Sequence, residues 1–289
     1  MSDAARQRGF TIIELVVVML LMGALAGIAG ALIVQPFRAS ADIAQRARLT
    51  DQADLVIDRV TRDVRAALPN SVRVRSAGGR TAVEFVSTRT GGRYRRLPPS
   101  GGGGDTLDRA RSSDTFDVLG GLPDIADVQT RSPGTDCANG AGDCISIYNT
   151  GQSGYNVYDG DNIAAVTARA DTAGNDQLSY DTGGSGPAFA SHSPHQRFFV
   201  IDDVVSYVCD NSTGELIRYA SYGLQSVQPV ADATFGTSSA LVAQDLSGCS
   251  FSYAAGTSTR QGLLTMNLGL THGGETVTLL AQAHVANVP

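Results

Sequence analysis

An uninterrupted apolar run near the N-terminus constrains this chain more than any other feature. Leu15 to Val34 are twenty consecutive residues without a charged side chain. As a helix that rises about 1.5 Å per residue, such a run spans ~30 Å, the thickness of a bilayer's hydrocarbon core. An ordinary secretory signal has an apolar region of only ~7–15 residues, followed by a small-residue cleavage site. Here no polar break follows until Gln35-Pro36. The run therefore predicts a membrane-spanning helix.

The charges before this run predict its orientation. Arg6 and Arg8 precede it, and positive residues beside a membrane span favour the cytoplasmic side. We therefore expect a single-pass membrane protein with its N-terminus in the cytoplasm and its C-terminal domain across the membrane.

Glu14 is a charged residue at the start of this apolar region. A carboxylate in hydrocarbon is costly unless it is paired, so it indicates a function by default. One alternative is that Glu14 lies at the level of the lipid headgroups. The other comes from its context, because Gly9-Phe10-Thr11-Ile12-Ile13-Glu14 resembles the processing site of type IV pilins and type II secretion pseudopilins.

The resemblance implies a processing and assembly scheme for these residues. Residues 1–9 would be a leader that a prepilin peptidase removes after Gly9, and the new N-terminal Phe10 would be methylated. Residues 10–36 would form the transmembrane and assembly helix. Glu14 would pair with the N-terminal ammonium of a neighbouring subunit and so set the register between subunits. The implied partners are other minor and major pilins, the prepilin peptidase and methyltransferase, an inner-membrane assembly platform and the lipid bilayer.

The remainder of the chain is long enough for one large domain or two small ones. The formal net charge is −6, so a general nucleic-acid-binding surface is not expected. The chain has 33 glycines and no tryptophan, which favours a loop-rich β protein.

Apolar periodicity predicts one more helical stretch before the strands begin. Residues 37–70 carry apolar side chains at three- and four-residue steps, ending at Pro69-Asn70, so we expect an amphipathic helix continuous with the membrane helix and bent or kinked near Pro36. Residues 71–289 are then expected to form a periplasmic β-rich domain. Within it, residues 150–197 are rich in Asp, Gly, Ser and Asn and predict a long surface excursion with few strands.

Several segments of this domain alternate between apolar and polar residues, as strands do. They are 71–76, 82–86, 116–118, 145–148, 198–208, 215–219 and a terminal hairpin over 264–285 that turns at His272-Gly-Gly-Glu275. The predicted fold class is α+β, a long N-terminal helix packed on an antiparallel sheet.

Four cysteines, Cys137, Cys144, Cys209 and Cys249, all follow the membrane segment. Four cysteines permit three pairings, and an oxidising periplasm would join them. Cys137 and Cys144 flank a flexible Ala-Asn-Gly-Ala-Gly-Asp turn, which favours their pairing and leaves Cys209 for Cys249. A zinc site is the rival, but no Cys-x-x-Cys spacing supports it.

No enzyme motif is present among those we considered, and no cofactor or metal is expected. Asp159-Gly-Asp161-Asn162 resembles the start of a calcium loop, but Ala170 occupies the position that needs a bidentate Glu. Gly-x-Ser-x-Gly and His-Glu-x-x-His are both missing, so an enzyme is not expected.

Other segments resemble a narrower group, the O-type minor pilins of mannose-sensitive haemagglutinin (MSHA) pili. They are 63–73, 198–219, 248–251 and 284–289. The resemblance implies a minor pilin that primes assembly of a pilus used in surface attachment, or lies near its tip. The J-type pseudopilin of type II secretion is the alternative. Many major pilins have a proline inside the membrane segment, whereas the first proline here is Pro36.

Overall fold

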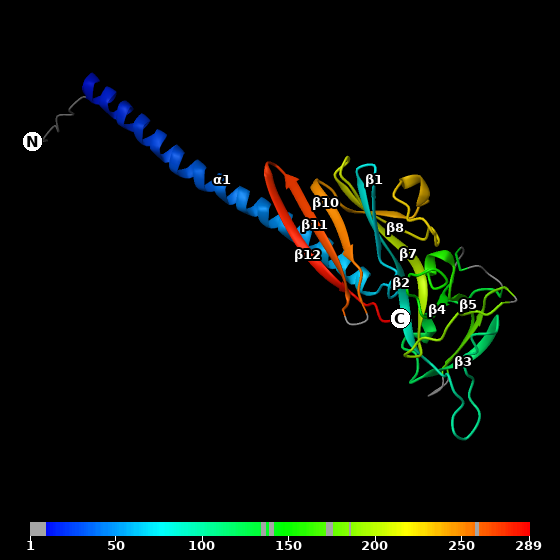
Figure 1. Cartoon of the computed structure of the whole chain (residues 1–289). Coiled ribbons are helices and arrows are strands. Elements are labelled where there is room, and N and C mark those ends of the chain that lie inside the picture. The colour runs from blue at the N-terminus through cyan, green and yellow to red at the C-terminus, as the bar shows by residue number, and fades with distance from the viewer. Residues whose placement is uncertain (1–9, 134–136, 139–141, 172–175, 185, 258–259) are drawn as a thin grey trace, which may run out of the picture.

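The described part of the chain begins with one long helix. The computed structural model describes residues 10–133, 137–138, 142–171, 176–184, 186–257 and 260–289, and of residues 31–39 it describes the backbone alone. Helix α1 runs from Ile12 to Arg65 without interruption, so it passes through Pro36. Figure 1 shows it as one rod whose described backbone makes no abrupt turn, so the expected bend or kink is not seen.

The helix ends before Leu68, where the apolar stripe had predicted its last turn. Leu68 donates its backbone N–H to the Val86 carbonyl at 2.8 Å, and the Ala66 carbonyl accepts from the Thr88 N–H at 2.9 Å. Residues 66–68 therefore pair with a strand, and this pairing replaces the last helical hydrogen bonds.

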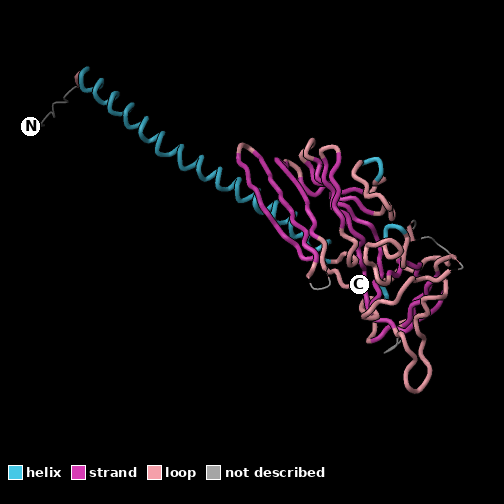
Figure 2. Tube along the Cα trace, viewed as in Figure 1, coloured by secondary structure: helices cyan, strands magenta, loops and turns pink. Residues whose placement is uncertain are grey.

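Two antiparallel sheets follow the helix (Figures 1 and 2). The larger has nine strands in the order β1-β2-β3-β6-β5-β4-β7-β8-β9, with β2 also paired to β7, and the smaller has three in the order β10-β11-β12. The strands are β1 Arg73–Ala77, β2 Arg80–Tyr94, β3 Ser113–Leu119, β4 Cys144–Ser146, β5 Ile163–Ala170, β6 Gln177–Asp181, β7 Arg197–Asp210, β8 Glu215–Ala220, β9 Ser239–Ala243, β10 Leu246–Ala254, β11 Gly262–His272 and β12 Glu275–Val285.

The second half of α1 supplies one layer of the main core. Leu49, Ala53, Val56, Val60 and Val64 are all buried, and their steps of three and four residues place them on one side of the helix. They share a hydrophobic cluster with the inner residues of the small sheet, among them Leu264, Met266, Ala283 and Val285. The predicted α+β class, a helix packed on antiparallel strands, is confirmed.

The C-terminal hairpin forms as its alternation predicts. Strands β11 and β12 pair in unbroken register from Gly262 opposite Val285 to His272 opposite Glu275. The two-residue turn consists of Gly273 and Gly274, with φ of 58° and 88°. Positive φ at both positions is the requirement of a type I′ turn, and glycine meets it without strain.

The prediction of a surface excursion over residues 150–197 needs correction. This stretch contributes β5 and β6 to the large sheet, and its Val166, Leu178, Tyr180 and Phe189 are fully buried in a second core. Strand β5 was hard to predict because half of it is alanine, and it has fewer β-branched and aromatic residues than strands usually have. It is held as a strand by pairing with β4 and β6.

Candidate assembly site at the N-terminus

The start of α1 brings two of the expected residues, Phe10 and Glu14, close to Thr11. Thr11 is the N-cap in an extended conformation, and its side-chain oxygen accepts the Glu14 backbone N–H at 3.4 Å. Thr-x-x-Glu is the capping-box pattern, in which the threonine satisfies one of the unpaired amides at the start of a helix. The same turn places the Glu14 carboxylate at the positive end of the helix dipole.

Phe10 lies immediately before this cap with 81% of its surface exposed, and Glu14 is exposed as well. Gly9, the expected cleavage position, lies outside the described residues. The sequence reading assigned Thr11 no separate role, although the Thr-x-x-Glu spacing is itself a sequence signal for a helix start.

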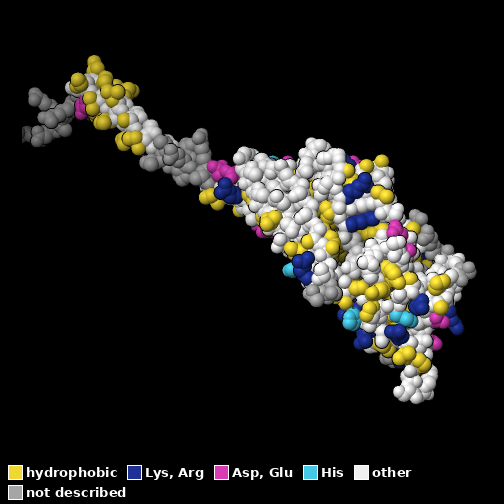
Figure 3. Space-filling view, in the orientation of Figure 1, with side chains coloured by type: hydrophobic (Ala, Val, Ile, Leu, Met, Phe, Trp, Pro, Cys, Tyr) yellow, Lys and Arg dark blue, Asp and Glu magenta, His cyan; other side chains and the backbone are white. Residues whose placement is uncertain are grey.

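The helix that carries these residues has no partner over its first half within the described chain. Ile12–Gly30 has a mean hydropathy of 2.6 and none of it is buried. Large apolar side chains from Phe10 to Ile28 keep between 46% and 86% of their surface exposed, and Figure 3 shows them covering the free end of the helix. An apolar helix of this length, bare on all sides, fits a lipid bilayer or the centre of a helix bundle.

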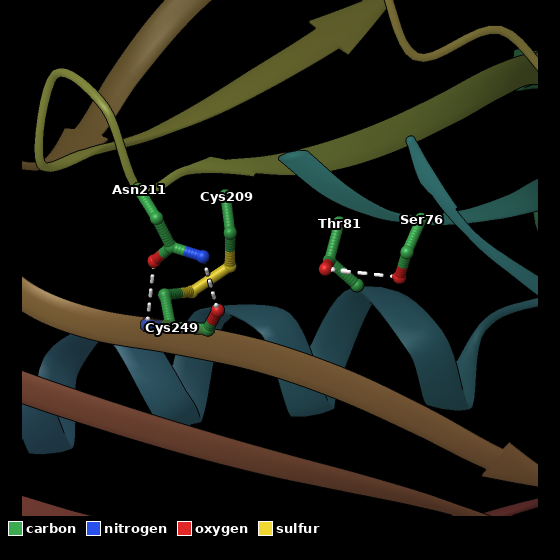
Figure 4. Close-up of a disulfide and its surroundings, with 5 residues drawn as sticks. All are labelled: Ser76, Thr81, Cys209, Asn211 and Cys249. Carbon is green, nitrogen blue, oxygen red and sulfur yellow. Dashed lines mark hydrogen bonds between the residues drawn. A yellow bond between two sulfur atoms is a disulfide. The ribbon is translucent and has the colours of Figure 1, made fainter. Parts of the chain in front are cut away.

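Two disulfides lie in the β-rich domain, away from this turn. The structure joins Cys137 to Cys144, with a Cα–Cα distance of 6.1 Å, and Cys209 to Cys249, with 5.7 Å. These are the pairs that the sequence predicts. Figure 4 shows the second bond lying over α1, where it links β7 of the large sheet to β10 of the small one.

Asn211 fixes the backbone beside this second disulfide. Its side-chain amide donates to the Cys249 carbonyl at 3.2 Å, and its side-chain oxygen accepts the Cys249 N–H at 3.0 Å (Figure 4). The disulfide and these two hydrogen bonds hold the two sheets in one register around the buried face of α1.

Peptide mapping tests the pairing. Under non-reducing conditions we expect one linked peptide pair containing Cys137 and Cys144, and another containing Cys209 and Cys249. The second bond closes a loop of 40 residues, so its reduction should lower the free energy of unfolding by about 3–4 kcal/mol in the chain-entropy model. A Cys144–Cys209 peptide would show that the pairing is wrong.

No feature of a metal centre was found in the described part of the chain. Among those residues, no three or more His, Cys, Asp or Glu side chains gather closely enough to hold a metal ion.

Comparison with known proteins identifies the N-terminal segment. Residues 4–30 match the family model described as the prokaryotic N-terminal methylation motif. The chain carries at its N-terminus the methylation motif of type IV pilin-like proteins. No curated protein and no solved structure matches the chain, so the likeness to pilins and pseudopilins rests on this motif. The motif implies processing by a prepilin peptidase and assembly with other pilins, the work of a structural subunit.

Mass spectrometry tests the cleavage position. In a host with a prepilin peptidase and its methyltransferase, we expect the mature chain to begin at N-methylated Phe10. A glycine before the cut leaves no side chain in the way of the peptidase. The same chain from a host without the peptidase is the control and should keep residues 1–9. An N-terminus at Met1 or Ser2 in assembled material would contradict the prediction.

Proposed function

We propose that the chain is a minor subunit of an MSHA-like type IV pilus, where it primes assembly or lies near the tip. The observation that carries the proposal is the combination of the methylation motif over residues 4–30 with a bare apolar helix on a large disulfide-linked domain. A domain of this size suits a subunit present in few copies better than one that repeats along the whole filament.

In this proposal the chain spans the inner membrane once before assembly. The N-terminus is cytoplasmic, the β-rich domain is periplasmic, and the mature subunit begins at Phe10. Glu14 then pairs with the Phe10 ammonium of a neighbouring subunit. The pilus serves attachment to surfaces.

The J-type pseudopilin of a type II secretion system is the second candidate, because the same N-terminal motif serves both classes of filament. Deletion of the gene separates the two. We expect fewer pili in sheared surface fractions and weaker attachment, with secreted enzymes unchanged, and restoration by the intact gene. Loss of protein secretion with normal pilus number would overturn the pilus proposal in favour of the pseudopilin.

A further inference from the structure

The loop between β2 and β3 projects from the end of the domain opposite the free end of α1 (Figures 1 and 2). At its base, the Leu107 N–H donates to the Arg95 carbonyl at 2.9 Å. At its tip, the Gly102 N–H donates to the Pro99 carbonyl at 3.0 Å, which closes a β-turn. The loop is therefore held by hydrogen bonds at both its base and its tip.

The side of this loop that leads into the turn is apolar. Leu97 keeps 73% of its surface exposed, and Pro98 and Pro99 are exposed as well. Single exposed apolar residues are ordinary on a protein surface. Three consecutive ones on a projecting loop form an apolar tip, which we define as residues 97–99, and burying this tip in an apolar phase is favourable.

Positive charge lies beside the same loop, and Figure 3 shows dark-blue and cyan side chains close together at this end of the domain. Residues 93–111 contain five arginines and two aspartates, and so carry +3 in a chain whose formal net charge is −6. Arg95 is paired with Asp117 at 2.9 Å, and Arg111 with Asp108 at 3.4 Å. The arginines here that form no ion pair with a described residue are Arg93, Arg96, Arg109 and Arg197, and all four are exposed.

Arg93 and Arg197 repel each other across the sheet. Their Cα atoms are direct partners in the β2–β7 register, and like charges in that position destabilise an antiparallel pair. Arg197 donates to the Val288 backbone carbonyl at 3.4 Å, and Arg109 donates to the Ala190 backbone carbonyl at 3.0 Å, so neither bond supplies a negative charge. The uncompensated positive charge favours a negatively charged partner.

We propose that this end of the domain docks on an anionic lipid surface, with the apolar tip at the level of the headgroups and the four arginines on lipid phosphates. Binding at a lipid surface combines buried apolar area with attraction between basic side chains and anionic lipids. A soluble polyanion would use the arginines but not the apolar tip. The loop from Arg95 to Leu107 also has no aromatic side chain that could stack on a base.

The position of the loop indicates which lipid surface this is. Because the loop lies opposite the free end of α1 (Figure 1), the lipid surface is not the bilayer that α1 would span. The proposal goes beyond the subunit role and does not depend on it, because the loop and the arginines belong to the β-rich domain of each single chain.

Sedimentation with vesicles tests the proposal. The full chain is held through α1 in nanodiscs of phosphatidylcholine, so that α1 is already embedded when vesicles are added, and empty nanodiscs are the control. We expect vesicles rich in phosphatidylglycerol to bind about tenfold or more tightly than vesicles of phosphatidylcholine alone, with weaker binding at high salt. Equal binding of the two kinds of vesicle, or of neither, overturns the proposal.

A double arginine variant tests the charge. Arg93→Gln combined with Arg197→Gln should weaken binding to the anionic vesicles about tenfold or more. Its melting temperature should stay the same or rise, because a pair of like charges is removed. Arg48→Gln combined with Arg65→Gln removes the same charge from the exposed side of α1 and should leave affinity within about twofold. Unchanged binding of the Arg93 and Arg197 variant overturns the proposal.

Substitutions at Leu97 test the apolar tip. Leu97→Ser should weaken binding about tenfold, because it removes the largest apolar side chain of the tip. Leu97→Met keeps an apolar side chain of similar size and should bind within about twofold of the unaltered chain. Unchanged binding of Leu97→Ser, together with a loss in the double arginine variant, would indicate a site for a soluble polyanion and overturn the lipid assignment.

Discussion

Glu14→Ala is expected to yield a subunit that is made, inserted and cleaved but does not enter filaments. Insertion and cleavage do not need the proposed pair between Glu14 and the neighbouring Phe10 ammonium, whereas assembly in this proposal does. The substitution leaves that ammonium buried and unpaired, which costs roughly 3–5 kcal/mol, a factor of hundreds or more in an association constant. Counting pili and this subunit in sheared fractions measures the effect.

Glu14→Gln is the matched control, because an amide oxygen still accepts a hydrogen bond from the ammonium. We expect it to be incorporated at a level between those of the alanine variant and the unaltered chain. Both variants keep Thr11 as the helix cap, since the bond at that cap uses the backbone N–H of residue 14. Normal incorporation of the alanine variant would mean that Glu14 merely lies among the headgroups.

Arg73→Met is expected to lower the free energy of unfolding by about 3–5 kcal/mol. Glu84 on β2 has a fully buried side chain, and Arg73 on β1 holds it through two hydrogen bonds of 3.0 and 3.2 Å. Methionine fills similar space but leaves a buried carboxylate without its cation. The guanidinium also lies 3.5 Å from the centre of the Tyr158 ring, and that cation–π contact is lost as well. Denaturant unfolding of the purified chain measures the change.

The free energy of unfolding lost in Arg73→Met should depend on pH. Burial raises the pKa of Glu84 above its ordinary 4.5, although the Arg73 guanidinium opposes the shift. A group whose pKa is higher in the folded than in the unfolded state stabilises the fold fully at pH below its unfolded pKa. This stabilisation is lost as pH rises through its folded pKa. The Arg73→Met deficit should therefore shrink as pH falls toward 4.5 and Glu84 takes up a proton.

Arg46→Met supplies the control for this pair. Arg46 contacts Glu275 at 2.9 Å, but its side chain is 65% exposed, and exposed pairs contribute about 0–1 kcal/mol. An Arg73→Met effect no larger than that of Arg46→Met, or one that grows toward low pH, would contradict the assignment.

Strong period-two alternation made the terminal hairpin predictable from sequence. Both β11 and β12 have one face on α1 and the other exposed. A strand in this position alternates between apolar and polar residues along its sequence. Strand β7 was equally visible because it is rich in Val, Ile, Phe and Tyr and lies within the large sheet.

Where a strand is buried on both faces, its surroundings could not be predicted from the sequence. Residues 82–86 form a strand, as their pattern predicted, but all five are buried. Tyr219, Val230 and Phe235 cover the side on which Ala82 lies. A charged residue such as Glu84 is then possible only because Arg73 lies opposite it in the β1–β2 register. That pairing follows from strand alignment and cannot be read from composition.

The candidate site was more predictable than the sheets because its chemistry is local. Phe10, Thr11 and Glu14 lie within five residues, so the first helical turn alone determines their positions relative to one another.

The packing of α1 also fixes when the chain can finish folding. The apolar stripe between Leu49 and Val64 is covered by β11 and β12, the last two strands in chain order. Some 200 residues separate α1 from β11, and at ~5–20 residues per second their synthesis takes roughly 10–40 s. Throughout that interval the stripe lacks its native cover and is open to holdases or to aggregation. A chain that terminates before Gly262 never acquires this cover, so its apolar stripe stays exposed.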